Sequence, residues 1–482
     1  MLPWGDAFGH RTYWGNEKNL ANSAKSCKNL QESIFFNNIA LKHQNHRLMI
    51  ELPPKIDRKK FIDAIINGVD ANIASIIEKI NEEYAYWDKV KYKAPDGTTP
   101  QQLWTLVKAS RTKGKINVWN KYSINLCLTN KMLRMCHDFD MKFGSFWEAE
   151  SDSQTKEKKY YLSSSLMEEA IYSSKMEGAS TTRVVAKEML RKNKSPQNKA
   201  QQMIANNYNT IQYIVEHRKD PLTEESLLYI HKLMTEKTLD NPDNAGRFRT
   251  NDEVVVADAI NDYIVYTPPT YKDIPDFITS LCDFFNNDNQ NIFIHPIIKG
   301  IIIHFMLAYM HPFVDGNGRT ARALFYWFML KENYKLTEYM SISRVIAKSK
   351  ASYEKAFRYT ENDGNDIGYF VTYNLRALEI SFQQLRDYIQ RKQQEKKAAN
   401  TFMIAGNINQ RQALVLQRLT EEPDTIMTVK DVQELFSVSS MTARKDLTEL
   451  VQQGYLNDLA INKVTRGYIL APLKRSDYNK ED

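Results

Sequence analysis

The chain has little cysteine, and its thiols are scattered. Only Cys27, Cys127, Cys136 and Cys282 occur in 482 residues, and no two of them form a CxxC pair. This pattern excludes a disulfide-stapled scaffold and the common zinc-binding spacings, so we expect a protein of the reducing cytoplasm. Long apolar runs are lacking as well. The longest, residues 292–310, is interrupted by two histidines, a proline and a lysine, which predicts a buried helix rather than a membrane span.

Charge of one sign is not in large excess either. Sixty-five Lys and Arg against 58 Asp and Glu give a formal net charge of +7, which requires neither a nucleic acid nor a membrane surface as a partner. Residues 1–10 have neither the basic start nor the apolar core of a signal peptide. With 42% apolar and 26% charged residues, the composition is that of a globular protein. The length predicts two to four domains, and no internal repeat is visible.

Apolar periodicity predicts a mainly α protein with three parts. The first is an amino-terminal helical region, residues 1–155, in which residues 56–80 have the pattern of an amphipathic helix or helix pair. A polar joint at residues 148–159 leads into the middle part, residues 156–395, which ends in a charged, solvated helix and a connector. Four tryptophans of the first part have no role that the sequence defines: Trp4, Trp14, Trp87 and Trp104.

The middle part contains one segment of a different kind. Residues 253–267 (EVVVADAINDYIVYT) hold two β-branched runs, which favour a hairpin, and Pro268-Pro269 ends them. A helix over residues 274–285 and the long apolar helix from about residue 292 follow. The middle part is therefore predicted to be a helical domain that carries one β-hairpin.

The third part, residues 400–475, has the pattern of a winged helix-turn-helix domain. Helices are predicted over residues 411–421, 429–436 and 439–453, with Gly454 closing the last, and strand-like runs follow at 455–461 and 465–470. Residues 401–475 carry nine Lys and Arg against eight Asp and Glu. In the third helix, the positive charges of Arg444 and Lys445 are offset by the negative charges of Asp446 and Glu449. DNA is thus a possible partner but not the favoured one, and protein docking is the alternative.

Polar and charged side chains that could act in catalysis or binding are concentrated at residues 311–322 (HPFVDGNGRTAR), between two strongly apolar helical stretches. Gly316 and Gly318 allow positive φ and bare backbone, so that successive N–H groups can surround an anion where a helix begins. Two other interpretations of residues 311–322 compete with an anion site. A dinucleotide-binding GxGxxA turn would need a preceding strand, and a structural turn between two helices would leave the charged residues solvated.

The charged side chains around these glycines suit phosphate chemistry. Asp315 is a hard oxygen ligand suited to Mg²⁺ that takes its other ligands from phosphates and water. Arg319 and Arg322 are three positions apart on one helix, so both can grip the same ligand. His311 is the one neutral-range base of the string and can take a proton from a hydroxyl.

At this point the sequence resembles a family. Residues 311–322 fit every fixed position of the signature HxFx[D/E]GNGRxxR of Fic domains, enzymes that commonly move AMP from ATP to a protein hydroxyl. The resemblance extends over roughly residues 160–379. It includes residues 253–269, similar to the target-docking flap of the family, and residues 246–249, similar to the stretch ahead of that flap.

The resemblance implies roles for the signature residues. His311 would be the catalytic base, and Asp315 would hold Mg²⁺ on the α and β phosphates. The nucleotide-binding residues would be the cradle of Gly316, Asn317 and Gly318, with Arg319 on the phosphates and Arg322 on the γ phosphate.

A shorter motif lies upstream of the signature. Residues 173–178 (SSKMEG) match [S/T]xxxE[G/N], which resembles the inhibitory motif of Fic proteins. The resemblance implies that Ser173 and Glu177, on a helix of about residues 162–178, switch the enzyme off when Glu177 pairs with Arg322. The competing interpretation of the same residues is an ordinary helix end with Gly178 as its cap.

We therefore expect a Fic helical core with a β-hairpin flap, an amino-terminal helical region and a carboxy-terminal winged helix. The expected function is protein adenylyltransferase, using ATP and Mg²⁺ on a Ser, Thr or Tyr hydroxyl of a target protein or of itself. A homodimer is plausible. The alternative function is a DNA-binding regulator in which the Fic core senses a nucleotide. Weaker expectations place Tyr353 and Asn362 beside adenine, and treat His295 and His304 as packed structural histidines.

Overall fold

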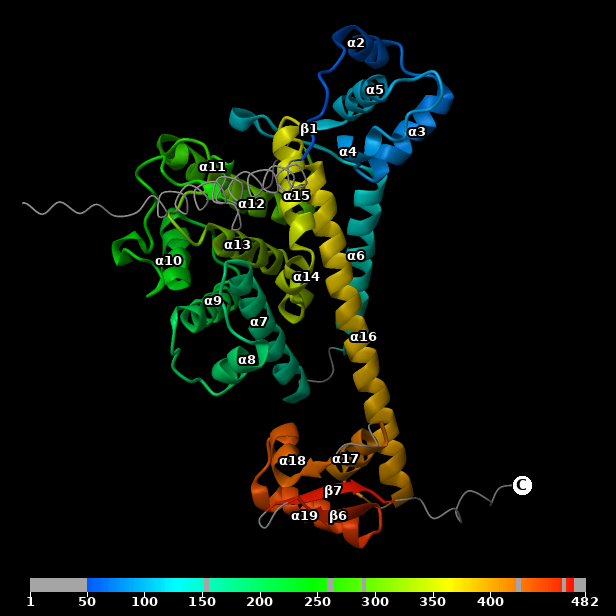
Figure 1. Cartoon of the computed structure of the whole chain (residues 1–482), viewed down its shortest axis with the longest axis vertical. Coiled ribbons are helices and arrows are strands. Elements are labelled where there is room, and N and C mark those ends of the chain that lie inside the picture. Colours follow the sequence, from blue (N-terminus) through cyan, green and yellow to red (C-terminus); the bar gives the residue numbers. More distant parts are fainter. Residues whose placement is uncertain are drawn as a thin grey trace, which may run out of the picture. The chain divides into compact units, whose positions relative to one another are not determined.

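The computed structural model describes residues 50–150, 156–257, 264–287, 292–406, 408–421, 426–461 and 465–471. Over these ranges the protein is mainly helical with small antiparallel sheets, which confirms the predicted fold class (Figure 1). The chain forms two compact units, residues 1–141 with 349–373 and residues 142–348 with 374–482. In the described part of the chain, no helix has the length and apolar character needed to cross a membrane.

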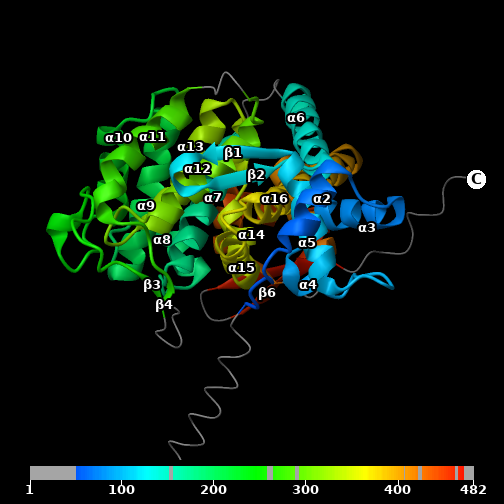
Figure 2. The same cartoon turned by 90° about the horizontal axis from the view of Figure 1, so that it is seen from above.

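The first unit is built around helix α5. Its elements are α2 (Arg58–Ile66), α3 (Ala71–Glu82), α4 (Trp87–Val90), α5 (Pro100–Lys113), β1 (Lys115–Trp119), β2 (Ile124–Cys127), the start of α6 (Asn130–Glu150) and α15 (Lys350–Asn362). Helices α2 and α3 both pack on α5 (Figure 2). They confirm the helix pair predicted over residues 56–80, with Asp57 and Asp70 as their N-caps. Sequence analysis missed the hairpin of β1 and β2.

The tryptophans of the first unit are core residues. Trp87 and Trp104 are 5% and 1% exposed, and their rings meet edge to face with centroids 6.1 Å apart. Helix α5 presents Trp104 because a capping box of Thr99 and Gln102 fixes where the helix begins. Trp4 and Trp14 lie outside the described residues.

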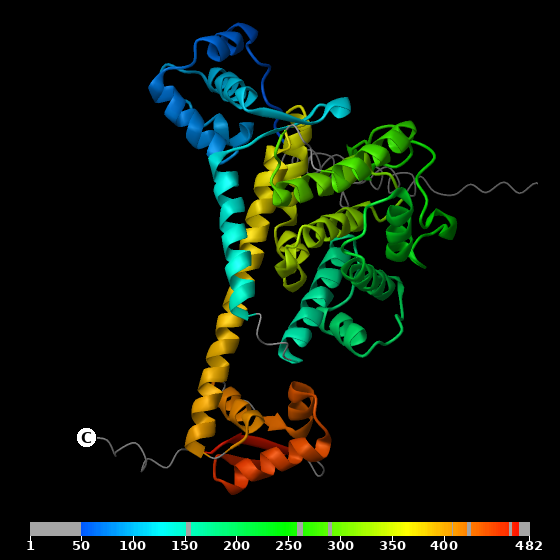
Figure 3. The same cartoon turned by 180° about the vertical axis from the view of Figure 1, so that it is seen from behind.

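The second unit holds the helices around the signature. They are α7 (Lys156–Met176), α8 (Arg183–Arg191), α9 (Lys199–Glu216), α10 (Glu224–Thr235), α11 (Ile274–Asn286), α12 (Pro296–Met310), α13 (Asn317–Lys331) and α14 (Ile342–Lys348), with the hairpin of β3 (Val256–Ala257) and β4 (Ile264–Tyr266). Nearly every side chain of α12 and α13 is buried. These two helices pack on each other and form the core of the unit (Figure 3, green and yellow-green ribbons).

Three boundaries differ from the expectations. The apolar helix begins at Pro296 rather than near residue 292, because His295 caps it and proline suits the first helical position. Helix α16 (Gly368–Gly406) continues without the connector expected after residue 395, since no proline or glycine interrupts it there. The joint expected at residues 148–159 is narrower: α6 and α7 extend into it, and residues 151–155 lie outside the described ranges.

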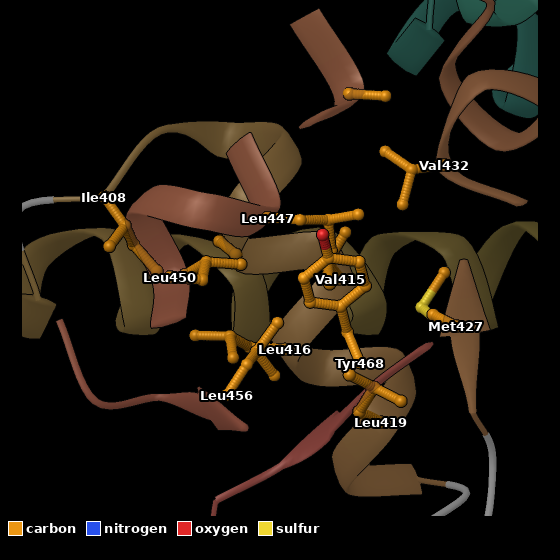
Figure 4. Close-up of a cluster of buried hydrophobic side chains, with 12 residues drawn as sticks. Ile408, Val415, Leu416, Leu419, Met427, Val432, Leu447, Leu450, Leu456 and Tyr468 are labelled. Atoms are coloured by element: carbon orange, nitrogen blue, oxygen red, sulfur yellow. The ribbon is translucent and has the colours of Figure 1, made fainter. Parts of the chain in front are cut away.

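The carboxy-terminal residues form the predicted winged helix. Its elements are α17 (Gln410–Glu421), β5 (Met427–Thr428), α18 (Val429–Phe436), α19 (Ser440–Gln452), β6 (Leu456–Ala460) and β7 (Arg466–Leu470), and the sheet order is β5-β7-β6. Thr428 and Ser439 cap α18 and α19. Leu416, Leu447, Leu450 and Leu456 share one buried cluster with Tyr468 (Figure 4). The exact domain boundaries given above stay a prediction.

Candidate active site

The signature forms the turn from α12 into α13. His311 ends α12 in the left-handed conformation (φ 48°), and Gly316 caps α13 with φ 83°. A Cβ on Gly316 would lie 2.8 Å from Thr235 Cγ2, so both the conformation and the space require glycine. The first N–H groups of α13 have no partner inside the helix. The turn therefore presents bare backbone donors, as the glycine spacing predicts.

Asn317 holds this turn together through its side chain. Its Oδ1 accepts from the N–H of Phe313 at 2.9 Å, and its Nδ2 donates to the carbonyl of Phe313 at 2.8 Å. Both ends of the amide are thereby used inside the loop. Asn317 can contribute to an anion site only through its backbone N–H, and the sequence alone did not show this division between side chain and backbone.

His311 is oriented as a base. Its Nδ1 donates a hydrogen bond to the carbonyl of Ala308, and a carbonyl can only accept, so the proton is assigned to Nδ1 and Nε2 keeps its lone pair. Burial lowers the pKa of His311, although the Ala308 carbonyl and the carboxylate of Glu177 act in the opposite direction. The imidazole is therefore neutral at pH 7 and able to accept a proton.

Arg319 is buried with too few partners. The residue is 1% exposed, and its Nη1 donates to the carbonyl of Met234 at 3.1 Å. Nε and Nη2 have no hydrogen-bond partner among the described residues, and Nη2 lies 3.6 Å from Asp315 Oδ2. Burial lowers the pKa of this guanidinium. Because buried donors nearly always make hydrogen bonds, two nitrogens without one on a single cation indicate an anion site.

Arg322 has partners on α7. Its Nε donates to Ser173 Oγ at 3.0 Å, and its Nη2 donates to the Ser173 carbonyl at 2.9 Å and to Glu177 Oε1 at 2.8 Å. The structure thus brings together the two residues of the upstream motif and the second arginine of the signature, which are 145 and 149 positions apart in the chain.

The end of α7 fixes the position of Glu177. The Ala179 N–H bonds to the Ser174 carbonyl and the Gly178 N–H to the Lys175 carbonyl, both at 3.1 Å, with Gly178 at φ 91°. This is a Schellman cap in which Glu177 is the last residue before the glycine. The helix cap and the contact of Glu177 with Arg322 are therefore one structure, and Gly178 positions the carboxylate.

The Glu177 carboxylate lies directly over the start of α13. A Cβ on Gly318 would overlap Glu177 Oε1, so only a glycine permits this approach. Burial tends to raise the pKa of Glu177, but Arg322, Arg319 and His311 together lower it. An ionised carboxylate therefore lies close to the start of α13 and accepts from Arg322, a side chain that the resemblance assigns to a phosphate.

Sequence analysis gave no role to His231, on α10. Its Nε2 donates to the carbonyl of Asp315 at 2.8 Å, while its Nδ1 accepts from the Gly246 N–H at 3.0 Å. The ring stacks on Phe313 with a centroid distance of 3.7 Å. Burial lowers the pKa of His231 to about 4. This neutral histidine positions the signature loop, and no local sequence pattern marks it.

Arg249 joins the flap to the signature. Its side chain is 1% exposed, its Nε donates to the His311 carbonyl at 2.9 Å, and its backbone N–H donates to the Pro312 carbonyl at 2.9 Å. The same guanidinium donates to the Pro269 carbonyl and to Asp252 Oδ1. The resemblance of residues 246–249 to the family pointed to this stretch but not to these contacts.

Asp315 is the single acidic ligand that the signature offers. Its side chain is 55% exposed, and its Oδ1 accepts from the Gly316 N–H at 2.6 Å. Within the ranges that the structure describes, no three His, Cys, Asp or Glu residues gather as a metal site. A divalent ion would therefore need most of its ligands from substrate oxygens and water.

The weaker candidates that the structure describes in detail make structural contacts within their own units. His304 is 2% exposed, and burial lowers its pKa to about 3, as suits a structural histidine. His295 caps α12 by accepting from the Ile297 N–H. Tyr353 packs on Phe357 and Phe370 in the first unit. Contacts of Tyr353 and Asn362 with adenine stay predictions.

Comparison with known proteins identifies two domains. Residues 221–329 match the Fic/DOC family, and residues 411–458 match the DeoR-like helix-turn-helix domain. The chain therefore carries a Fic domain that contains the signature, followed by a DeoR-like helix-turn-helix domain.

The relatives of the Fic region include proteins named for an activity. The chain is 29% identical over 138 residues to a protein adenylyltransferase Fic of Nematostella vectensis, covering 25% of this chain and 30% of that protein. It is 32% identical over 123 residues to protein adenylyltransferase fic-1 of Caenorhabditis elegans, covering 25% of this chain and 22% of that protein. Each match spans less than a third of the relative.

A solved structure is similar over more of the chain. The crystal structure of a Fic family protein from Desulfovibrio desulfuricans G20 matches with a TM-score of 0.48 and 18% sequence identity. The match covers 72% of this chain and 97% of that chain.

Proposed function

We propose that the protein is a nucleotidyltransferase that moves AMP from ATP to a Ser, Thr or Tyr hydroxyl of a target protein, itself included. One juxtaposition carries the proposal. The signature turn combines His311, whose Nδ1 is held by a carbonyl, with Arg319, a buried cation with two nitrogens that lack a hydrogen-bond partner among the described residues. The adenylyltransferase names of the similar proteins support the choice of nucleotide and reaction.

The geometry suits transfer at the α phosphorus. The target oxygen attacks this phosphorus in line, the bond to the β phosphate oxygen breaks, and pyrophosphate leaves. His311 Nε2 takes the hydroxyl proton. The N–H groups at the start of α13, with Arg319 and Arg322, hold phosphate oxygens before charge develops on them. Bound Mg²⁺, held by Asp315 and phosphate oxygens, would neutralise part of that charge.

We further propose that Glu177 keeps the enzyme inactive. Its carboxylate takes the Arg322 Nη2 that would otherwise grip the γ phosphate. A triphosphate that enters meets a like charge and loses one grip, so its α phosphorus is not aligned for attack. Self-modification and modification of a partner are then both limited by the same ion pair.

Intact-mass spectrometry of Glu177→Gly tests this function. The variant is incubated with Mg²⁺ and, in separate reactions, ATP, GTP, CTP and UTP. We expect a mass increase of one or more AMP groups with ATP and none with the Glu177→Gly, His311→Ala double variant, which is the matched control. No added mass with any nucleotide, or equal addition by the double variant, would contradict the proposal.

DNA binding by the winged helix is the second candidate, and one observation favours it. Asp446 is 2% exposed and turned into the domain, where Asn409 and Arg411 donate to its carboxylate. It therefore does not offset Arg444 and Lys445, which are exposed on α19. This corrects the charge balance drawn from the sequence, in which Asp446 counted against them, although Lys445 still has Glu449 at 3.8 Å.

A gel-shift assay with the full chain tests this second candidate. Charge reversal of Arg444 and Lys445 together should weaken retention of duplex DNA and flatten its salt dependence. Arg418→Glu, on the exposed part of α17, is the control. Retention that is absent at low salt, or unchanged by the reversal, would leave protein docking as the role of the domain. A homodimer, also proposed, is tested by sedimentation of the same full chain.

A further inference from the structure

Arg249 holds the carbonyl groups at the end of α12. A helix leaves its last carbonyls without partners inside the helix, and Pro312 has no N–H that could continue the pattern. The Arg249 side chain donates to the His311 carbonyl at 2.9 Å and to the Met310 carbonyl at 3.5 Å. Its backbone N–H donates to the Pro312 carbonyl at 2.9 Å. One residue therefore supplies donors to three consecutive carbonyls around His311.

The same guanidinium bonds both roots of the β3–β4 hairpin, which we define as residues 251–252 and 269–271. Its Nη1 donates to the Asn251 carbonyl and to Asp252 Oδ1, each at 2.8 Å. Its Nη2 donates to the Pro269 carbonyl on the other root. Both ends of the hairpin are therefore tied to the side chain that holds the end of α12.

The Arg249 side chain has no donor left for a ligand. It is 1% exposed, and each of its five N–H hydrogens has an acceptor within 3.5 Å. Arg319 of the same unit keeps two nitrogens without a hydrogen-bond partner among the described residues. Because a rigid fork with every donor bonded has one orientation, Arg249 fixes the geometry of its neighbours, whereas Arg319 is available to an anion.

The backbone that Arg249 holds has an uncommon conformation. His311 lies in the left-handed region, with φ 48° and ψ 59°, which a residue with a Cβ adopts only where surrounding contacts compensate for the strain. In this conformation the imidazole Nδ1 donates to the Ala308 carbonyl. The bond from Arg249 Nε to the His311 carbonyl fixes the ψ angle of His311. Without this bond, the conformation that directs Nε2 loses its support.

A second contact ties the hairpin to α12. The Tyr266 hydroxyl, on β4, donates to the Tyr309 carbonyl at 2.7 Å, and the centroids of the two rings lie 5.7 Å apart. Tyr309 directly precedes Met310, the last residue of α12. The hairpin therefore reaches the end of this helix through a strand as well as through its roots.

We propose that Arg249 is a positioning residue, which holds the base His311 in its working orientation and fixes the hairpin to it. This role rests on the proposed function, in which His311 Nε2 accepts the proton of the target hydroxyl. Since the hairpin and the base share one anchor, a hydroxyl held by the hairpin meets Nε2 at a constant distance.

Self-labelling kinetics of the full chain test the proposal. The parent is Glu177→Gly, and Arg249→Lys keeps the positive charge but removes the planar fork. We expect kcat to fall about 10- to 100-fold, because a misplacement of about 1 Å has an effect of this size. KM for ATP should stay within about threefold, since the donors at the start of α13 are unchanged. Arg247→Lys is the matched control, because it makes the same change on an exposed side chain two positions away.

A double-mutant cycle shows whether Arg249 acts through the base. Arg249→Lys is also made in the Glu177→Gly, His311→Ala chain, where it should cause no further loss of the residual labelling rate. A merely structural role would lower the rate by the same factor with and without the imidazole. Equal losses in the two backgrounds, or a loss no larger than that of Arg247→Lys, would overturn the proposal.

NMR of the imidazole tests the positioning without any activity. In the nucleotide-free full chain with isotope-labelled histidine, the His311 Nδ1–H should exchange with water faster in Arg249→Lys than in the parent or in Arg247→Lys. Tyr266→Phe, which loses one hydroxyl and keeps the ring, should change the same exchange rate to a smaller extent, and circular dichroism verifies both folds. Unchanged exchange in both variants would contradict the positioning role. If Glu177→Gly incorporates no AMP, the proposed function fails, and the imidazole signal still decides whether Arg249 positions His311.

Discussion

Two buried arginines, one in each unit, show how differently the same side chain is used. Arg111 is 3% exposed, and each of its three nitrogens donates: to Asn81 Oδ1 at 2.9 Å, to the Tyr369 hydroxyl at 2.6 Å and to the Ala85 carbonyl at 2.9 Å. Arg319 is 1% exposed and makes one such bond. A fully paired guanidinium stabilises a fold, whereas one with open nitrogens is prepared for an anion.

The largest effect should come from the base beside the underpaired arginine. His311→Ala, made in the Glu177→Gly background, should lower the rate of self-modification by about 10²- to 10⁴-fold, because a positioned base contributes this much. Nucleotide binding should persist. The rate is measured with α-labelled ATP. His217→Ala is the control, and a loss of less than threefold in the His311 variant would remove this histidine from the chemistry.

Replacing each arginine by methionine tests the comparison itself. Arg111→Met leaves Asp363 and Asp366 short of a partner in a buried site, so the free energy of unfolding should fall by about 3–5 kcal/mol. Arg319→Met removes a cation with few partners and should change it by less than about 1 kcal/mol, while abolishing labelling. Urea unfolding followed by tryptophan fluorescence measures both. Equal destabilisation by the two variants would break the distinction between them.

A buried histidine next to the site should make the second unit sensitive to acid. The pKa of His304 is lowered by burial to about 3, with Arg322 as the charged group that acts on it. Its contribution to stability is complete above the unfolded pKa and is lost as pH falls. We expect the loss to reach about 3 kcal/mol between pH 6.5 and pH 4. His304→Gln should lack this part of the pH dependence, and identical pH curves would refute the assignment.

The smallest effect is a displacement of the pH profile. Burial lowers the pKa of His311, so the acid limb of kcat/KM for Glu177→Gly should have its midpoint below pH 6.5. Removing Glu177 acts in the same direction, because its carboxylate raises this pKa. The profile is measured in buffers of constant ionic strength. A midpoint at or above 6.5 would mean that the imidazole is more hydrated than its surroundings indicate.

The sequence predicted the parts of this molecule that local patterns control. The winged helix followed from three capped helices and two short strands, and the helix pair near the amino terminus followed from apolar spacing. The hairpin of β1 and β2 was missed although Lys115–Trp119 alternates polar and apolar residues, because its two strands are only five and four residues long. The continuation of α16 past residue 395 was missed because a connector was expected after the charged helix, although nothing there breaks a helix.

The residues of the candidate site also divide into those that a local sequence pattern marks and those that it does not. The signature glycines and the α7 motif were visible because each is local, and the structure places Glu177 on Arg322 as the motifs imply. His231 and Arg249 were given no role because their work is done through carbonyls 84 and 62 positions away. Asp446 was counted as an exposed charge because the sequence does not show that α19 turns it inward. Long-range backbone contacts leave no local pattern.

The central claim is that Glu177 inhibits by occupying Arg322, and a double-mutant cycle on self-labelling tests it most directly. Glu177→Gly is introduced into the wild-type chain and into Arg322→Ala, and AMP incorporation is measured at saturating ATP and Mg²⁺. The account predicts a large increase in the wild-type background and none in the Arg322→Ala background. The increase arises because Arg322, once released from Glu177, can hold the γ phosphate. An equal increase in both backgrounds would contradict it.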